Sequence, residues 1–498
     1  MNLNKLVFLG LFLASFVVKG QNKQILYDFS EIPQSAMVNP GVETDFQWYA
    51  GIPVLSGVML QAGSSGIAVD DIFANDGIDI NDKIRDRAIY GMDIKDELSG
   101  TFQVEFLNLG FRGKNPDLFY TGGMYLEGDA IGYWFRDYAI LAYEGNADRL
   151  NERFDLSHLK TRGELVNVLH FGVNKNVVDG LTIGGRAKIY SSIFDFSSTK
   201  NRGYFVTSPG ENNIYVSTLE ANMQLRTSGI NSISDSFDDE TTGSTILKRA
   251  LLGGNLGLGF DLGFTYHLSD QLVVTGSLLD LGFIYHANDV KTFSLNGRNT
   301  VEGLEVILPD AFNDPDTDFW EDLVDEVEEF LPFEDDSNSY VSFRPTKLYG
   351  SIRYNFGEPV SGMTNCDCGI NAGRSPSNRA KYVNGLGAQL YAINRPRGPQ
   401  AALTAFYHRR FGNFMALKAT YTVDKFTYSN VGLGINLQAG PVNFYAMADN
   451  LLAYRNIAAS NYASFQLGLN IIFFEEVKPD AIKLAIVSKI FDFNSFGS

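Results

Sequence analysis

Apolar residues occupy every second position along residues 256–268. One face of this segment carries seven apolar side chains: Leu256, Leu258, Phe260, Leu262, Phe264, Tyr266 and Leu268. The other face carries small or polar residues: Gly257, Gly259, Asp261, Gly263, Thr265 and His267. A period of two residues is that of a β-strand. The 13 residues of this segment exceed the usual strand of roughly 5–6 residues and suit a tilted strand that crosses a bilayer.

The same alternation recurs in residues 181–190, 415–422, 431–438 and 464–473, and short turns join several of these segments. An apolar face toward lipid and a small or polar face toward a lumen are typical of outer-membrane barrels. The sequence therefore predicts an all-β fold, a transmembrane antiparallel β-barrel. A soluble β-sandwich is the alternative, and it would have shorter strands and more than the 15 Pro of this chain.

Sixteen segments have the length and composition of strands. They are residues 46–60, 100–113, 117–128, 133–145, 164–174, 180–195, 212–227, 255–268, 272–287, 340–356, 381–393, 400–411, 413–423, 427–439, 442–453 and 462–474. Bacterial barrels need an even number of strands, and one or two segments would belong to a plug or a surface hairpin. We predict about 14 wall strands within residues 46–474, with 12 and 16 as alternatives.

Residues 1–20 have the pattern of a secretory signal peptide. Lys5 precedes an apolar run over residues 6–18, which is too short to span a bilayer, and Val18 and Gly20 suit cleavage before Gln21. No later apolar run approaches the roughly 20 residues of a membrane helix. We expect an exported chain that resides in the outer membrane.

The composition of the chain argues against several classes of function. The formal net charge is −18, which argues against a nucleic-acid partner because phosphate binding needs clustered Lys and Arg. The chain has only 5 His and 2 Cys, and no P-loop, G-x-S-x-G or HExxH motif occurs. We expect no catalytic residues, no cofactor, no bound metal and therefore no enzyme.

Three segments lack the alternation of wall strands. Residues 21–45 are predicted to form a hatch inside the barrel or a loose N-terminal arm, and residues 67–98 and 298–339 to form loop insertions. Within the last insertion, residues 318–331 read as an acidic amphipathic helix with an apolar stripe that includes Trp320, Leu323 and Val327. This helix either folds over its own barrel or docks a partner. The spacing of its acids lacks the glycine of an EF-hand, although a Ca²⁺ site at Asp314, Asp316 and Asp318 is a further alternative.

The two cysteines, Cys366 and Cys368, lie in a loop rich in Gly, Ser and Asn. An exported chain meets an oxidising compartment, so a local disulfide is the expected state. Two free thiols are one alternative. A metal site is another, but two thiolates without a nearby His make an incomplete zinc set.

Charged residues on the polar faces of predicted strands should point into the lumen. They are Arg186, Lys188, Asp261, Asp280, Lys418 and Asp449. We interpret them as structural ion pairs that can also hold a plug, with a conduction or binding path as the alternative.

Several segments resemble outer-membrane barrels of the Bacteroidota: residues 257–269, 277–284, 445–452 and 462–474. Near the mature N-terminus, Pro33-Gln34-Ser35 and Asn39-Pro40 resemble the entry segment of the FadL/PorV-like superfamily. The resemblance implies about 14 strands with an N-terminal segment in the lumen. One departure is that 24 residues, 475–498, follow the predicted closing strand.

Two functions are compatible with this resemblance. The first is a plugged PorV-like subunit that docks other envelope proteins, which the acidic loop and the C-terminal tail favour. In the tail, Ile486, Ile490 and Phe491 belong to an apolar series that can dock on a partner. The alternative is a FadL-like transporter of hydrophobic or small molecules. In both cases membrane lipid surrounds the barrel.

Overall fold

The structure is a computed structural model, and it describes residues 23–211, 214–234, 242–302, 334–359 and 382–474. Among these residues, no helix is long and apolar enough to cross a membrane.

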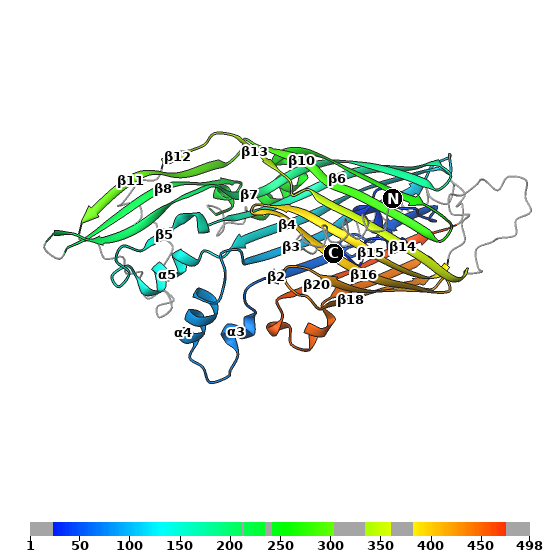
Figure 1. Cartoon of the computed structure of the whole chain (residues 1–498). Helices are drawn as coiled ribbons and strands as arrows, with labels where there is room; N and C mark the ends of the chain where they lie inside the picture. The colour runs from blue at the N-terminus through cyan, green and yellow to red at the C-terminus, as the bar shows by residue number, and fades with distance from the viewer. Residues whose placement is uncertain (1–22, 212–213, 235–241, 303–333, 360–381, 475–498) are drawn as a thin grey trace, which may run out of the picture.

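Twenty strands form one closed antiparallel sheet, and 14 positions of this sheet make a barrel wall (Figure 1). The first position is shared by β1 (Trp48–Gly51) and β2 (Val58–Ser64), which both lie between β3 and β20. The remaining wall strands are β3 (Glu97–Arg112), β4 (Leu118–Tyr133), β6 (Thr161–Val178), β7 (Leu181–Pro209), β9 (Asn255–His267), β10 (Leu272–His286), β14 (Lys347–Pro359), β15 (Tyr382–Arg395), β16 (Gly398–Phe411), β17 (Met415–Val423), β18 (Asn430–Ala439), β19 (Val442–Asp449) and β20 (Tyr462–Phe473). The prediction of a 14-stranded membrane-type barrel is confirmed.

The two faces of the wall follow the alternation of the sequence. On β9, Leu262 is 44% exposed on the outside, whereas Thr265 is 5% exposed on the inside. Neighbouring strands have the same arrangement, so apolar side chains cover the outer surface. An outward apolar band of this kind is what a hydrocarbon environment requires.

The two ends of the barrel differ. Short turns join β3 to β4, β6 to β7, β9 to β10, β16 to β17 and β18 to β19 at the end where β1 begins and β20 finishes. Outer-membrane barrels place short turns in the periplasm and long loops outside the cell. By analogy we call the end with the short turns the periplasmic end and the opposite end the extracellular end. The extracellular end carries α3 (Val69–Phe73), α4 (Ile80–Lys83) and the π-helix η1 (Ile84–Ile89) between β2 and β3, and the 3-10 helices η5 (Leu451–Arg455) and η6 (Ile457–Ala459) between β19 and β20.

A sheet extends far beyond the barrel at the extracellular end (Figure 1). It comprises the distal half of β7 with β5 (Arg153–Asp155), β8 (Tyr215–Ser228), β11 (Val290–Glu302) and β12 (Glu334–Asp336). Helix α5 (Arg136–Glu144) and η2 (Leu156–His158) lie beside one face, where Ile140, Phe205 and Leu219 share an apolar cluster. The remaining described elements are α6 (Asn231–Ser234), α7 (Thr242–Lys248), the π-helix η4 (Arg249–Gly253) and β13 (Tyr340–Phe343).

Of the sixteen segments read as strands, one is wrong and one is a strand outside the barrel wall, as was expected for one or two of them. Residues 133–145 form mainly α5, because its apolar residues at helical spacing cover the cluster on the extension. Residues 212–227 correspond to β8, which alternates as a wall strand does, but its apolar face packs on protein instead of lipid. Alternation alone does not show whether the apolar face of a strand contacts lipid or protein. Likewise, the insertion expected at 298–339 includes the last residues of β11 and all of β12.

Candidate functional site

The barrel lumen is filled by the N-terminal segment 23–47, which we call the hatch. Its short helix α2 (Ser35–Val38) is completely buried. Polar groups tie the hatch to many wall strands: Ser277 Oγ donates to the Val38 carbonyl at 2.6 Å, and Asn174 Nδ2 donates to the Val42 carbonyl at 2.9 Å. Most of the segment predicted as a hatch, 21–45, therefore lies where a plug would lie.

One half of the lumen is aromatic and apolar. Ile25, Leu26, Tyr27, Phe29 and Ile32 of the hatch are buried there. They share a cluster with inward side chains of the wall: Tyr349, Tyr391, Ala402, Ala416, Tyr445 and Met447. The rings of Tyr27 and Tyr349 stack with centroids 4.8 Å apart. The lumen of a water-filled porin is polar, whereas this cluster offers apolar contact, with Lys418 and Gln389 bonded to hatch carbonyls beside it.

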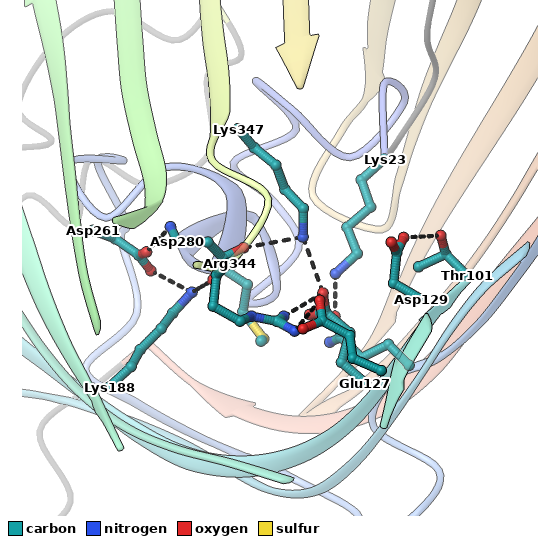
Figure 2. A network of polar contacts seen from close by, with 12 residues as sticks. Lys23, Thr101, Glu127, Asp129, Lys188, Asp261, Asp280, Arg344 and Lys347 are labelled. Atoms are coloured by element: carbon teal, nitrogen blue, oxygen red, sulfur yellow. Dashed lines mark hydrogen bonds and ion pairs between the residues drawn. The ribbon is translucent and has the colours of Figure 1, made fainter. Parts of the chain in front are cut away.

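Another part of the lumen holds a chain of alternating charges, and four of the predicted lumen residues begin it. Figure 2 shows three of them, Lys188, Asp261 and Asp280. Arg186 and Lys188 on β7 both contact Asp261 on β9, at 2.6 and 2.9 Å. Lys188 also contacts Asp280 on β10 at 2.6 Å. All four side chains are at most 3% exposed.

The chain of charges continues through residues that the sequence analysis did not single out. Lys347 joins Asp280 to Glu127 on β4, with both contacts at 3.0 Å. Arg344 then joins Glu127 to Glu164 on β6, at 2.9 and 2.5 Å. The carboxylates within the chain have a cation on either side, which offsets the cost of burying charge. We call the set from Arg186 to Glu164 the ion-pair chain.

A bulge in β10 makes the position of Asp280 possible. The pairing of β9 with β10 shifts between Leu278 and Leu281, so an additional residue enters the strand. Asp280 has a φ of +59°, a conformation that Asp tolerates better than most residues. Its backbone N–H donates to Asp261 Oδ1 at 2.7 Å. The bulge thus turns Asp280 into the lumen and anchors it on Asp261.

Arg186, the first residue of the ion-pair chain, is hydrogen-bonded to the hatch. Arg186 donates from Nη1 to the Ala36 carbonyl at 3.1 Å and from Nη2 to the Met37 carbonyl at 2.6 Å. At the other end of the hatch, Lys23 donates to Gln103. Burial lowers the pKa of Lys23 to about 8, although Glu127 opposes this shift. The ion-pair chain and the hatch therefore form one connected polar structure.

A second polar contact holds the hatch near the periplasmic end. Glu31 forms an ion pair with Arg410, and His408 Nε2 lies 3.4 Å from Glu31 Oε2. Burial by itself raises the pKa of the Glu31 carboxyl, but Arg410 and His408 lower it more, so the pKa lies well below its usual range. This ion pair lies beside a small cavity of about 90 Å³ between hatch and wall.

The last two predicted lumen residues lie inside the barrel but outside the ion-pair chain. Lys418 is fully buried, donates to the Tyr27 carbonyl and lies 4.2 Å from the centre of the Phe406 ring. Asp449 accepts from Ser464 Oγ at 2.7 Å. Both side chains therefore make local contacts that are separate from those of Arg186 and Asp261.

The other candidates fall outside the described residues. They are the signal peptide, the two cysteines Cys366 and Cys368, the docking stripe Trp320, Leu323 and Val327, and the tail residues Ile486, Ile490 and Phe491. Across the part of the chain that the structure describes, no group of three or more His, Cys, Asp or Glu side chains is placed to hold a metal ion.

The alternation of residues on β4 indicates that Glu127 faces the lumen. Tyr125, Glu127 and Asp129 alternate with Leu126, Gly128 and Ala130 on β4, and this parity puts them in the lumen. Asp129 there pairs with Arg395, and Thr101 donates to it at 2.8 Å. Arg344 lies between β13 and β14, where no alternation marks it.

Comparison with known proteins identifies a family for most of the chain. The model of the "Family of unknown function (DUF5723)" matches residues 40–449. The chain belongs to this family. No curated protein matches the chain.

Solved structures similar to this DUF5723 member are outer-membrane barrels. A Pseudomonas aeruginosa FadL homologue is 10% identical, with 90% of this chain and 95% of that chain covered and a TM-score of 0.39. The Ralstonia pickettii toluene transporter TbuX is 8% identical, with 92% and 96% covered and a TM-score of 0.37. The P. putida toluene transporter TodX is 9% identical, with 91% and 92% covered and a TM-score of 0.35. Likeness at this level does not bear on what this chain binds.

Proposed function

We propose that this DUF5723 protein is a gated outer-membrane channel for small hydrophobic molecules, which pass through the side of the barrel at its first wall position. The observation that carries the proposal is the interruption between β1 and β2. There residues 52–57 leave the regular strand ladder and keep only a few backbone hydrogen bonds to β3 and β20, and a side chain of the hatch bonds to this segment from inside.

The interruption comprises residues 52–57. Pro53, Val54 and Leu55 lie outside the regular strand ladder and are exposed on the lipid side. Val54 has a φ of +67°, which is unfavourable for a β-branched residue. The neighbouring β3 has its own irregularity at this level, between Glu105 and Leu107. The regular strand pairing is therefore disturbed on two neighbouring strands at the same level of the wall.

Gln34 of the hatch braces the interruption from inside. Its Nε2 donates to the Ser56 carbonyl at 2.8 Å, to Glu105 Oε2 at 3.1 Å and to Asn470 Oδ1 at 2.9 Å. Asn470 Nδ2 returns a hydrogen bond to Gln34 Oε1 at 3.1 Å. One amide thus connects the hatch, the interruption, β3 and β20. We call this group of contacts the Gln34 latch.

A hydrophobic cargo is favoured by the aromatic half of the lumen. Hatch residues such as Tyr27 and Phe29 occupy an environment of Tyr349, Tyr391 and Tyr445. When the hatch moves, these aromatic side chains lose their apolar partners. An apolar molecule would replace those contacts, whereas a hydrated ion would not.

Replacing Gln34 by Ala should speed uptake of a small hydrophobic dye, such as phenylnaphthylamine, several-fold in cells that carry the protein in their outer membrane. The matched control is Asn39→Ala, which removes a hatch-to-wall hydrogen bond of 3.2 Å to Phe264 without touching the Gln34 latch. Dye fluorescence follows entry. Equal rates for Gln34→Ala and the unaltered protein would contradict the latch.

Crosslinking supplies the converse test. Gln34→Cys and Asn470→Cys are combined with Cys366→Ser and Cys368→Ser, and a short cleavable thiol crosslinker is added. We expect the link to stop dye uptake and cleavage to restore it. Uptake that continues in the crosslinked protein would overturn the proposed route through the wall.

A docking subunit for other envelope proteins is the second candidate function. It is favoured by the extracellular sheet, whose face opposite α5 carries exposed polar residues: Lys200, Arg202, Asn222, Asn296 and Arg298. Arg202→Glu with Arg298→Glu should abolish capture of crosslinked envelope partners and leave dye uptake unchanged. Unaltered partner recovery would count against this candidate.

A further inference from the structure

A groove of about 520 Å³ lies on the outside of the wall, toward the extracellular end of β2, β3 and β4. Its floor is formed by Ala62, Gly100, Ala130 and Gly132. The parity of these residues is that of the exposed Leu60 and Leu98, so the floor belongs to the lipid-facing surface. The groove is separate from the hatch and from the Gln34 latch.

Side-chain size explains the depth of the groove. Ala463, Ala62, Gly100 and Ala130 are register partners on four adjacent strands and form one line across the wall. The line ends at the next partner, Gly163, because the ring of Phe196 covers it. The next line toward the periplasm begins with Phe465, Leu60 and Phe102, which are also register partners. The surface therefore steps down from large to small side chains and forms a channel along the line.

The barrel does not need glycine at two of the floor positions. A Cβ added to Gly100 would meet only the Gln61 carbonyl oxygen, at 3.8 Å, and one added to Gly132 would meet only Thr161 Oγ1, at 3.9 Å. By contrast, a Cβ on Gly128 would lie 2.2 Å from the Phe102 ring. Neither Gly100 nor Gly132 has a positive φ. An added Cβ would therefore clash with nothing at either position, and larger side chains built on it would occupy the groove.

Two loop elements border the groove on the extracellular side. Val69 of α3 and Ile457 of η6 line it and are 59% and 54% exposed. Figure 1 shows α3 beside the orange helical segment that contains η6, at the ends of β2 and β20. Their apolar side chains continue the lipid-facing surface past the last wall residues. The groove therefore opens toward the bilayer and is bordered on its extracellular side.

We infer that this groove binds one acyl chain of a membrane lipid. The groove is continuous with the surface that already faces lipid, so an acyl chain needs no route to reach it. Strands lie about 4.8 Å apart, so the four open strands give a line of about 14 Å. One leaflet of a hydrocarbon core of roughly 30 Å is about 15 Å thick, which suits a single chain lying in this line. The inference does not depend on the proposed channel.

Photocrosslinking tests the inference on the intact protein in nanodiscs. A small fraction of the lipid is a phospholipid with a diazirine in the middle of one acyl chain, and labelled peptides are mapped by mass spectrometry. We expect labelling of residues 98–102 and 130–132 to exceed that of the matched lipid-facing surface around Gly350 several-fold. Uniform labelling around the barrel would overturn the inference.

Variants then separate the groove from general lipid contact. Gly100→Leu with Ala130→Leu should reduce labelling of the floor peptides to the level of the rest of the wall. Gly350→Leu is the matched control, because a Cβ there also meets only one atom, the Thr275 carbonyl oxygen at 3.9 Å. Ala62→Leu provides a second filled groove if the double variant fails to insert. Unchanged floor labelling in an inserted, filled variant would also overturn the inference.

Discussion

Replacing Asp261 by Ala should lower the free energy of unfolding by about 3–5 kcal/mol, because removing one partner of a buried ion pair leaves the other charge uncompensated. Asp261 is 0% exposed and is shared by Arg186 and Lys188. Lys188 retains Asp280, whereas Arg186 keeps the uncharged hatch carbonyls of Ala36 and Met37. The backbone N–H of Asp280 also loses its acceptor. Urea unfolding of the barrel in lipid vesicles measures the change.

An exposed ion pair provides the control. Glu220 and Arg298 on the extracellular sheet lie 4.0 Å apart, with side chains 47% and 65% exposed. Glu220→Ala should therefore change stability by no more than about 1 kcal/mol. Equal effects of Asp261→Ala and Glu220→Ala would contradict the assignment of Asp261 to a dry, paired environment.

A double substitution should recover part of the stability that Asp261→Ala loses. Asp261→Leu combined with Arg186→Met removes both charges of this pair, and Lys188 keeps Asp280 as its partner. Replacing a whole buried pair by apolar residues is often neutral or stabilising, so the double variant should recover part of the loss caused by Asp261→Ala. The Ala36 and Met37 carbonyls would still lose their donor, Arg186. We therefore expect looser attachment of the hatch even where the wall itself is restored.

The wall could be predicted because its information is local. Each strand must show apolar side chains to lipid at every second residue, and residues such as Leu258, Leu262 and Leu437 need no distant partner to do so. The same parity placed Arg186, Lys188 and Asp261 in the lumen. Period-two reasoning thus supplied both the strand count and much of the ion-pair chain.

The ion pairs that these charges form could not be predicted in the same way. Lys347 reaches Glu127 only because the closed barrel brings β14 and β4 to face one another across the lumen, although the two residues are 220 positions apart in the sequence. The bulge that turns Asp280 inward is likewise set by pairing with β9. Local periodicity carries no information about contacts across the lumen or about irregularities in register.

The contacts of the hatch also could not be predicted from local periodicity. A segment without alternation was recognisable as something other than wall, but Gln34 is an ordinary amide in sequence. Its importance comes from the coincidence of Ser56, Glu105 and Asn470 around one side chain. Likewise, α5 was mistaken for a strand because its apolar residues contact a distant sheet, which appears only after the chain has folded.

Arginine at Leu262 should lower stability by about 2–4 kcal/mol, because a charge on the lipid face near the bilayer midplane costs that much. Leu262 is 44% exposed, lies near the middle of β9 and has Gly185 and Leu278 as register partners. Leu268→Arg is the matched control: the same substitution on the same face, just beyond the end of β9 and 54% exposed. A charge near the interface costs about 0–1 kcal/mol, so this variant should fold almost normally. Unfolding in vesicles compares the two. Equal losses would show that depth in the bilayer does not govern the cost, and the outward face of β9 would then contact something other than lipid.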